Sequence, residues 1–208
     1  MITLALTKGR ILKETLPILE RSGIVLQEDV FASRKLIFNT NHSDIRCIVL
    51  RGSDVPTYVQ MGTADMGVAG KDNLLEQQLS GYYEQIDLGI SRCRLSTAGL
   101  KGYQRHSGSR IKVATKFVNI ARQYYADKGI QAEIIKLYGA VELAPIMHLA
   151  DEIVDIVDSG NTLKANGLEV LEDITHISSR LIVNHASMKL KYQRILAIVN
   201  QVKSTLAD

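Results

Sequence analysis

The sequence is poor in the residues that build disulfide scaffolds and structural zinc sites. It has only two cysteines, Cys47 and Cys93, which lie far apart on strand-like segments. Two distant thiols fit a reduced cytosolic protein better than a disulfide framework. The five histidines show no metal-ligand spacing with one another or with cysteine, so a structural zinc site is not expected.

The sequence also lacks long apolar stretches and any large excess of positive or negative residues. No stretch approaches the length of a membrane span, and Met1–Lys8 lacks both the basic start with a long apolar core and the cleavage site of a signal peptide. The 25 basic and 22 acidic residues are interspersed and give a net charge of only +3. We therefore expect a cytoplasmic protein with no membrane and no nucleic-acid partner, while an anionic small substrate stays open.

What the chain does have is an apolar fraction of 46% over 208 residues, which is ample for a core. Strand-like segments alternate with amphipathic helical ones, and this alternation predicts largely parallel sheets covered by helices. In the first half, strands are expected at 2–6, 35–38, 46–50 and 65–69, with helices at 11–22, 54–62 and 71–78.

A second alternating unit follows the polar loop 101–109, near which a domain boundary is expected. It includes a helical segment expected around 141–149 and an irregular strand-like stretch expected from 167 to 183. The simplest topology has the chain cross to a second domain near residue 90 and return near residue 180. The predicted fold class is therefore α/β, with two α/β lobes around a cleft. Residues 1–90 and 179–208 would form the first lobe, and residues 91–178 the second. The helical spacing of 188–202 leaves an apolar face that needs a partner, and a neighbouring copy of the chain is one candidate.

The stretch Glu152–Leu163 carries the clearest chemical pattern. A β-branched apolar run leads to Asp155 and Asp158, and then to four small or polar residues, Ser159, Gly160, Asn161 and Thr162. Backbone N–H groups in such a turn favour a phosphate, and Thr162 is predicted to cap the short helix that follows. The two carboxylates can accept hydrogen bonds from sugar hydroxyls. A phosphoribosyl group needs both kinds of partner, whereas an ordinary strand, turn and helix with solvated aspartates is the alternative.

No nucleotide P-loop pattern occurs anywhere in the chain. Six other segments follow one another with informative spacing: Leu6–Ile11, Ser33–Leu36, Leu50–Val59, Gly62–Asp72, Tyr138–Pro145, and the stretch through the phosphate loop to Asn166–Leu168. Together these segments resemble one family, the ATP phosphoribosyltransferases in their short form.

The resemblance implies a two-domain fold like that of periplasmic binding proteins of type II. It also implies a reaction that joins N1 of the adenine of ATP to the anomeric carbon of phosphoribosyl pyrophosphate and releases pyrophosphate, in the first step of histidine biosynthesis. Because both substrates are polyanions, Mg²⁺ and several arginines are expected to neutralise their phosphates. The Mg²⁺ ligands are not assigned.

The arginines expected to act on the phosphates are Arg10, Arg34 and Arg51, each in a turn or at a strand end. Taken singly, each also fits a solvated surface arginine. Lys8 and Gly9 make the first loop the strongest case, because glycine allows the backbone to approach a ligand closely.

Within the family pattern, Asp155 and Asp158 are expected to hold the ribose hydroxyls and Ser159–Thr162 the 5-phosphate. Glu142 resembles a cleft carboxylate that orients adenine or ribose, although an ordinary glutamate at a helix start fits as well. Cys93 is expected beside the adenine and not as a nucleophile. Asp65 and Asp72 resemble metal or phosphate-side residues, but capping and loop roles are favoured.

The chain has one helix after residue 188, so the C-terminal regulatory domain of longer family members is not expected. The resemblance then implies a separate regulatory subunit related to histidyl-tRNA synthetase, and hence a hetero-oligomer. Two other functions are compatible with the pattern. One is a non-catalytic two-lobe ligand-binding module, and the other is a nucleobase-salvage phosphoribosyltransferase, whose usual pair of adjacent acids is absent.

Overall fold

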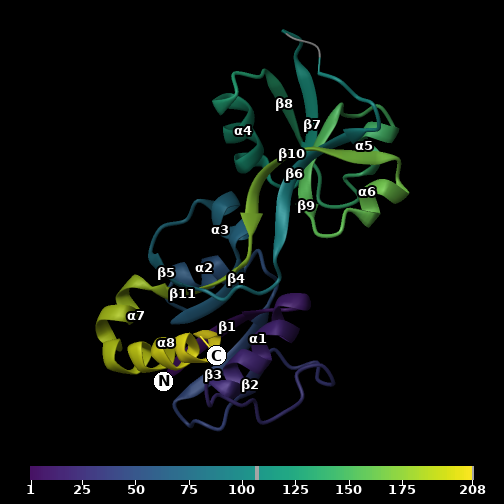
Figure 1. The fold of residues 1–208 in the computed structure, drawn as a ribbon. Coiled ribbons are helices and arrows are strands. Elements are labelled where there is room, and N and C mark those ends of the chain that lie inside the picture. Colours follow the sequence, from purple (N-terminus) through teal and green to yellow (C-terminus); the bar gives the residue numbers. More distant parts are fainter. Residues whose placement is uncertain (106–107, 208) are drawn as a thin grey trace. The chain divides into compact units, whose positions relative to one another are not determined.

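The computed structural model describes residues 1–105 and 108–207, and the chain divides into two compact units (Figure 1). Unit 1 contains Met1–Leu74, Gln78–Ser91 and the stretch from Ser178 onward. Unit 2 contains Leu75–Gln77 and Arg92–Ile177. The expected boundary near the loop 101–109 is wrong, because the loop's described residues lie inside unit 2, while residues 106 and 107 lie outside the described part.

Unit 1 is built on a six-stranded sheet in the order β2-β3-β1-β4-β11-β5. Its strands are β1 (Ile2–Thr7), β2 (Ile37–Asn39), β3 (Ile45–Leu50), β4 (Met66–Gly70), β5 (Tyr82–Asp87) and β11 (Ser179–Asn184). β1 pairs in parallel with β3 and β4, and the other neighbours are antiparallel. Every residue of β1 is buried, which is typical of a parallel strand covered on both faces.

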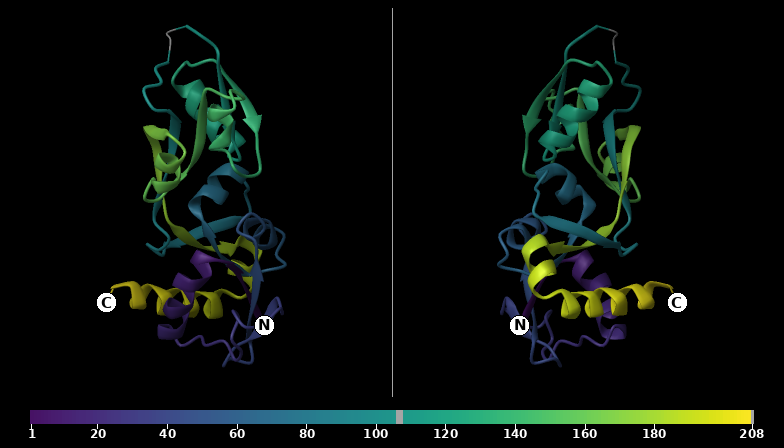
Figure 2. Two further views of the ribbon diagram at one scale, coloured as in Figure 1. Left: turned by 90° about the vertical axis from the view of Figure 1, so that its right-hand side faces the viewer. Right: turned by 90° about the vertical axis from the view of Figure 1, so that its left-hand side faces the viewer.

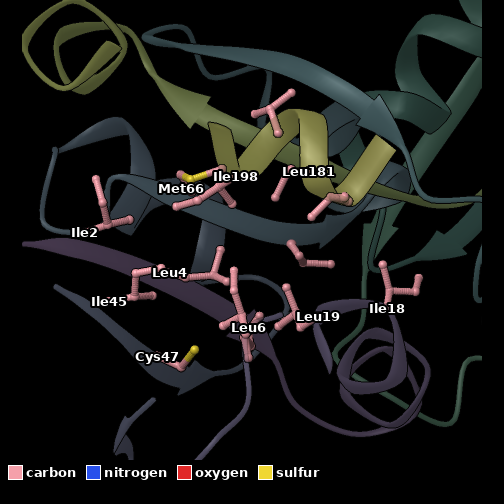
Figure 3. Packing of buried hydrophobic residues seen from close by; sticks show 14 of the residues in the cluster. Ile2, Leu4, Leu6, Ile18, Leu19, Ile45, Cys47, Met66, Leu181 and Ile198 are labelled. Carbon is pink, nitrogen blue, oxygen red and sulfur yellow. The ribbon is translucent and has the colours of Figure 1, made fainter. Parts of the chain in front are cut away.

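Helices of unit 1 cover both faces of this sheet. They are α1 (Arg10–Arg21), α2 (Val55–Gln60), α3 (Lys71–Gln77), whose last three residues belong to unit 2, α7 (His185–Leu190) and α8 (Tyr192–Ala207). Leu4 and Leu6 point into a core with α1 and α8 (Figure 3). Ala5, on the opposite face, packs with α2 and α3. Alternation along β1 therefore divides the apolar side chains between two layers.

The C-terminal helix is an integral part of unit 1. α8 lies beside α1 (Figure 2), and the hydroxyls of Ser22 and Thr205 lie 3.4 Å apart between them. The apolar side chains of its inner face are buried in the core of the unit: Ile195, Ile198, Val199 and Val202. The partner that this face was expected to need is the chain's own sheet and α1, so the face does not require a neighbouring copy.

Unit 2 has a five-stranded sheet in the order β10-β6-β9-β7-β8. The strands are β6 (Cys93–Leu100), β7 (Ile111–Thr115), β8 (Ala132–Lys136), β9 (Glu152–Val157) and β10 (Leu168–Ile177), and the helices are α4 (Val118–Asp127), α5 (Leu143–Ile146) and α6 (Asn161–Ala165). β9 lies in the centre, parallel to β7 and antiparallel to β6. The strand that leads to the predicted phosphate loop is thus held on both sides.

A buried ion pair anchors the start of β9. Glu152 is fully buried, and Arg105 donates hydrogen bonds to both of its carboxylate oxygens, with Nη2 2.7 Å from Oε2. The hydroxyl of Tyr125 adds a third bond at 2.7 Å. Burial beside this carboxylate raises the pKa of Tyr125, so the phenol stays a donor. These partners satisfy a charge that would otherwise be costly to bury, and they fix the end of β9 opposite its loop.

Glu172 extends this network at the edge of unit 2. It accepts hydrogen bonds from Arg105, Tyr124 and Lys128. Its pKa falls to about 2, chiefly because Lys128 and Tyr124 donate hydrogen bonds to the ionised carboxylate. These contacts connect β10 to α4 and to the chain before β7. Their role is structural, because they hold Arg105, which in turn binds Glu152 at the start of β9.

Three local expectations differ from the structure. The strand β5 was not predicted, because its sequence Tyr-Tyr-Glu-Gln-Ile-Asp is mostly polar and it lies at a sheet edge. The helix expected at 141–149 is only the four-residue α5. The irregular strand-like stretch expected between residues 167 and 183 is extended, but it forms two regular strands, β10 and β11, which belong to different sheets.

Within the part of the chain that the structure describes, no helix combines the length and apolar character needed to cross a membrane.

Candidate functional site

The predicted phosphate loop follows the central strand of unit 2 directly. β9 ends at Val157, and Gly160 has φ of 76°, a left-handed conformation that glycine adopts without strain. The carbonyl of Gly160 accepts a hydrogen bond from the backbone N–H of Lys164 at 3.1 Å. The N–H of Asn161, the first of α6, donates to the hydroxyl of Ser159 at 3.3 Å, and the other N–H groups of the first turn lack an α-helical acceptor, which leaves them available to an anion.

The predicted cap at Thr162 is wrong. Gly160 occupies the N-cap position of α6, and the hydroxyl of Ser159, not that of Thr162, accepts a hydrogen bond from the first helical N–H, that of Asn161, at 3.3 Å. Thr162 lies inside the first turn, where its carbonyl accepts a hydrogen bond from the side-chain amide of Asn166 at 2.9 Å. Because α6 has only five residues, its dipole is small, and the loop's own N–H groups are its main means of binding a phosphate.

The structure brings most of the predicted substrate residues of unit 2 together. A hollow of about 170 Å³ is lined by Glu142, Asp155, Asp158 and the loop Ser159–Thr162. Glu142 precedes α5, and its side chain makes no capping hydrogen bond there. The hollow is therefore lined by a loop of small residues and by three carboxylates, of which two lie beside the loop and the third, that of Glu142, comes from a separate segment.

Asp155 is the most informative carboxylate of the hollow. Its side chain is only 22% exposed, and its Oδ1 atom is buried without a hydrogen-bond partner in the described chain. The nearest charge is the Nζ atom of Lys116, 3.4 Å from Oδ1, which forms an ion pair without hydrogen-bond geometry. Buried polar atoms are nearly always hydrogen-bonded, so a carboxylate with one unsatisfied oxygen at the wall of a hollow is a candidate ligand acceptor.

Lys116 is not among the site residues predicted from the sequence. It follows the last residue of β7, and the pairing of Thr115 with Val154 brings it next to Asp155. The signal that could have found it is topological: residues that follow parallel neighbouring strands meet at one edge of the sheet.

Cys93 lies near this edge but does not line the hollow. It is the first residue of β6, and the next residue, Arg94, pairs with Val157 at the end of β9. Its thiol is half-buried, whereas that of Cys47 is buried in unit 1, and burial raises the pKa of Cys47 to about 12. Neither Cys47 nor Cys93 forms a disulfide.

In unit 1, the predicted phosphate residues share one edge of the sheet. Lys8, Gly9 and Arg10 follow the end of β1, and Arg51 follows the end of β3, which pairs with β1 through Thr7 and Leu50. β2 runs antiparallel to β3, so Arg34, ahead of β2, belongs to the same edge. Ligands of open α/β sheets bind outside the carboxyl ends of the strands, and this edge is such a place.

The three arginines differ in their contacts. Arg10 begins α1 after Gly9, whose φ is 89°, and its Nε atom lies 2.7 Å from Oε1 of Glu14. This hydrogen bond lowers the pKa of Glu14, which also accepts a bond from the hydroxyl of Ser91. Arg34 and Arg51 are exposed, and neither forms an ion pair or side-chain hydrogen bond with any other described residue.

Asp65 has a structural role, in agreement with the interpretation favoured from the sequence. Its carboxylate accepts hydrogen bonds from the backbone of Thr3 at 2.8 Å, the hydroxyl of Ser187 at 2.6 Å and the ammonium of Lys191 at 2.7 Å. Asp72 lies buried in the first turn of α3, beside the side chain of Asn73.

Metal binding would have to involve few protein ligands. Among the described residues, no group of three or more histidine, cysteine, aspartate and glutamate side chains is arranged to hold a metal ion. Asp155 and Asp158 nevertheless offer the hard oxygen atoms that Mg²⁺ prefers.

These features define a class: a protein of two α/β units, with polar residues gathered at the carboxyl edges of both sheets, which is the architecture of two-lobed ligand-binding proteins. A structural comparison agrees at the level of the fold. The zinc-bound ligand-binding component of an ABC-type import system from Staphylococcus aureus matches with a TM-score of 0.56 at 11% identity, covering 98% of this chain and 72% of that one.

The closer comparisons identify the family. The family model of ATP phosphoribosyltransferase matches residues 51–204. ATP phosphoribosyltransferases from Saccharophagus degradans and Marinobacter nauticus are 60% and 62% identical to the chain, covering 100% and 99% of it and 97% and 95% of their own lengths. The ATP phosphoribosyl transferase (HisG:HisZ) complex from Thermotoga maritima matches with a TM-score of 0.87 at 34% identity, over 100% of this chain and 99% of that one.

The chain therefore belongs to the ATP phosphoribosyltransferase family. It is a glycosyltransferase of the first step of histidine biosynthesis, which transfers the phosphoribosyl group of phosphoribosyl pyrophosphate to N1 of the adenine of ATP and releases pyrophosphate. The resemblance noted in the sequence is confirmed, and the two alternative functions are set aside.

Proposed function

We propose that the hollow of unit 2 binds phosphoribosyl pyrophosphate. The observation that carries this proposal is the convergence of the loop Ser159–Thr162 with Asp155 and Asp158 around one space of about 170 Å³. Backbone N–H groups of the loop would hold the 5-phosphate, and the two aspartates would accept hydrogen bonds from the ribose hydroxyls. Glu142, on the rim, would orient the ribose or the adenine, and Cys93 would lie beside the adenine.

Arg10, Arg34 and Arg51, with Lys8 and Gly9, would bind the triphosphate and the pyrophosphate. A guanidinium presents a fixed fork of donors that matches phosphate oxygens. The pyrophosphate gains negative charge as the bond to the anomeric carbon breaks, so donors placed beforehand stabilise the transition state more than the ground state.

Mg²⁺ fits this proposal as a cofactor held mainly by the substrate. Mg²⁺ commonly binds through one or two carboxylates together with substrate phosphates, and Asp155 and Asp158 supply such carboxylates. When bound, the ion would neutralise charge on the pyrophosphate. We also assign the enzyme to the cytoplasm, in keeping with its two free thiols.

The binding assignment can be tested with Asp155→Asn and Asp158→Asn. Each change removes the charge from an acceptor of the ribose hydroxyls, and a hydrogen bond to a charged group contributes about 1.5–3 kcal/mol. The dissociation constant for phosphoribosyl pyrophosphate, measured by calorimetry, should rise by roughly ten- to a hundredfold in each variant.

Asp127→Asn is the matched control, because Asp127 is an exposed acid at the end of α4 in the same unit. It should leave the dissociation constant unchanged. Normal binding in both loop variants would show that the substrate lies elsewhere.

A separate regulatory subunit completes the proposed function. The Thermotoga maritima relative is described as a HisG:HisZ complex. We infer that this chain likewise assembles with a partner related to histidyl-tRNA synthetase and is a hetero-oligomer in the cell. Docking of the partner would favour the active conformation, which the lone chain visits only part of the time.

Histidine is therefore expected not to inhibit the isolated chain. Turnover should rise when the partner is added, and inhibition by histidine should appear only then. The measurement is a histidine titration of the steady-state rate, with the pure chain and with the complex purified from the native cell. Strong inhibition of the pure chain would contradict this assignment of regulation.

A further inference from the structure

The hollow of unit 2 has an unfavourable charge for the ligand proposed to bind there. Among the described residues that line it, three are carboxylates and none is basic. A phosphate bears up to two negative charges, so these carboxylates repel it unless a cation compensates. The neutral loop Ser159–Thr162 supplies N–H dipoles but no full positive charge. The lining therefore leaves a place for a cation from outside it, in addition to any Mg²⁺ that arrives with the substrate.

Lys116 supplies that cation. Its Nζ atom is 3.4 Å from the buried Oδ1 of Asp155, and its side chain is 45% exposed. The ammonium also lies 4.8 Å from the centre of the Phe117 ring, which attracts cations to its face. Lys116 is thus oriented by two partners, one charged and one aromatic.

The backbone that carries Lys116 is firmly placed. The hydroxyl of Thr115 donates to the carbonyl of Val154 at 2.6 Å and accepts from the backbone N–H of Phe117 at 2.8 Å. These bonds bracket Lys116 and link it to the residue before Asp155. The distance between the lysine and the aspartate is therefore set by the pairing of β7 with β9 and not by a flexible loop.

We propose that Lys116 is a positioning residue for phosphoribosyl pyrophosphate. It acts through Asp155: the ammonium neutralises the carboxylate and holds Oδ1, so that Oδ2 accepts the hydrogen bond from a ribose hydroxyl. The inference rests on the proposed function of the hollow and adds to it a residue that sets affinity without touching the reacting atoms.

The first test is Lys116→Met, which keeps most of the apolar side chain and removes the charge. KM for phosphoribosyl pyrophosphate should rise about tenfold while kcat changes less than about threefold, because the residue orients an acceptor and does not meet the leaving group. Lys116→Arg should recover part of the loss, since it restores the charge with a different donor geometry. Lys112→Met is the control, because Lys112 is an exposed lysine near the other end of β7.

The decisive test combines Lys116→Met with Asp155→Asn. If Lys116 acts through Asp155, the double variant should bind phosphoribosyl pyrophosphate within about twofold of Asp155→Asn alone, because the charge to be neutralised is gone. Two losses that multiply would overturn the proposal, since Lys116 would then act on the substrate by another route.

The outcomes also separate this inference from the proposal on which it rests. If Asp155→Asn binds normally, the hollow is not the substrate site. If Asp155→Asn weakens binding and Lys116→Met does not, the site stands and the role given to Lys116 is wrong. Circular dichroism and the melting temperature of each variant would establish that the fold is retained.

Discussion

Replacement of Gly160 by valine is expected to raise the dissociation constant for phosphoribosyl pyrophosphate by at least about a hundredfold, with unit 2 still folded. Gly160 has φ of 76°, a region in which a β-branched residue is strongly disfavoured. The loop must shift to relieve this strain, and a displacement of about 1 Å in a binding group can reduce activity by about a hundredfold. Calorimetry on the purified variant measures the effect.

Gly129→Val controls for the cost of backbone strain alone. Gly129 follows α4 in the same unit and has φ of 66°, and an added Cβ there meets nothing within 4 Å. At Gly160 the nearest atom to an added Cβ is Cγ1 of Val157 at 3.8 Å, so an added Cβ has ordinary space at both positions. Both variants should lose about 1–2 kcal/mol of stability, and only Gly160→Val should lose binding.

Gly160→Asn distinguishes two causes of the loss. Asparagine tolerates the left-handed region better than other residues with a Cβ. If the loop conformation is what matters, Gly160→Asn should bind better than Gly160→Val. If the ligand approaches the backbone too closely for any side chain, the two variants should be equally impaired. Normal binding by a folded Gly160→Val protein would contradict the assignment of the loop.

The loop could be predicted from the sequence because its pattern is local. The β-branched run before Asp155 indicates a buried strand, and the small residues after Asp158 indicate a tight turn, so strand, turn and acids are all read within 12 residues from Glu152 to Leu163. The predicted N-cap, Thr162, lies two residues after the observed one, Gly160. Glycine can take this position because the backbone there is left-handed, a conformation that serine or threonine would resist.

The partners of the loop could not be predicted in the same way. Lys116 is 39 residues from Asp155 in sequence, and only the parallel pairing of β7 with β9 brings the two together. The same holds for Arg105 and Glu152, whose buried ion pair depends on the course of the chain between β6 and β7. A pattern of single residues carries no information about strand order, so contacts across a sheet remain hidden until the topology is known.

The alternation of strands and helices predicted two α/β lobes, and this prediction is confirmed in the fold. The expectation of largely parallel sheets is wrong, because antiparallel neighbours such as β4 and β11 or β6 and β9 make both sheets mixed. The polar strand β5 escaped because, at a sheet edge, it lacks the apolar run that marks an inner strand. The apolar face of α8 was recognised, but its partner was not, since helical spacing shows that a face is buried without showing what buries it.

Arg10→Ala, Arg34→Ala and Arg51→Ala are each expected to lower kcat by about a hundredfold or more, which is the usual effect of removing one donor from a developing negative charge. The melting temperature should change by less than about 2 °C, because an exposed arginine contributes little to a core. Lysine at the same positions should restore activity only in part, because an ammonium lacks the planar fork that binds two phosphate oxygens.

Two controls make this result specific. Arg21→Ala removes an exposed arginine from the last turn of α1, at the end of the helix opposite Arg10, and should leave kcat unchanged. Glu14→Gln breaks the same ion pair that Arg10→Ala breaks, yet it keeps the guanidinium. If Arg10 serves only that ion pair, the two variants should behave alike. If Arg10 binds a substrate phosphate, Glu14→Gln should retain most of the activity that Arg10→Ala loses. Steady-state kinetics at saturating ATP and phosphoribosyl pyrophosphate separates these cases. If kcat is unchanged in all three alanine variants, the arginines are surface residues with no role in the reaction.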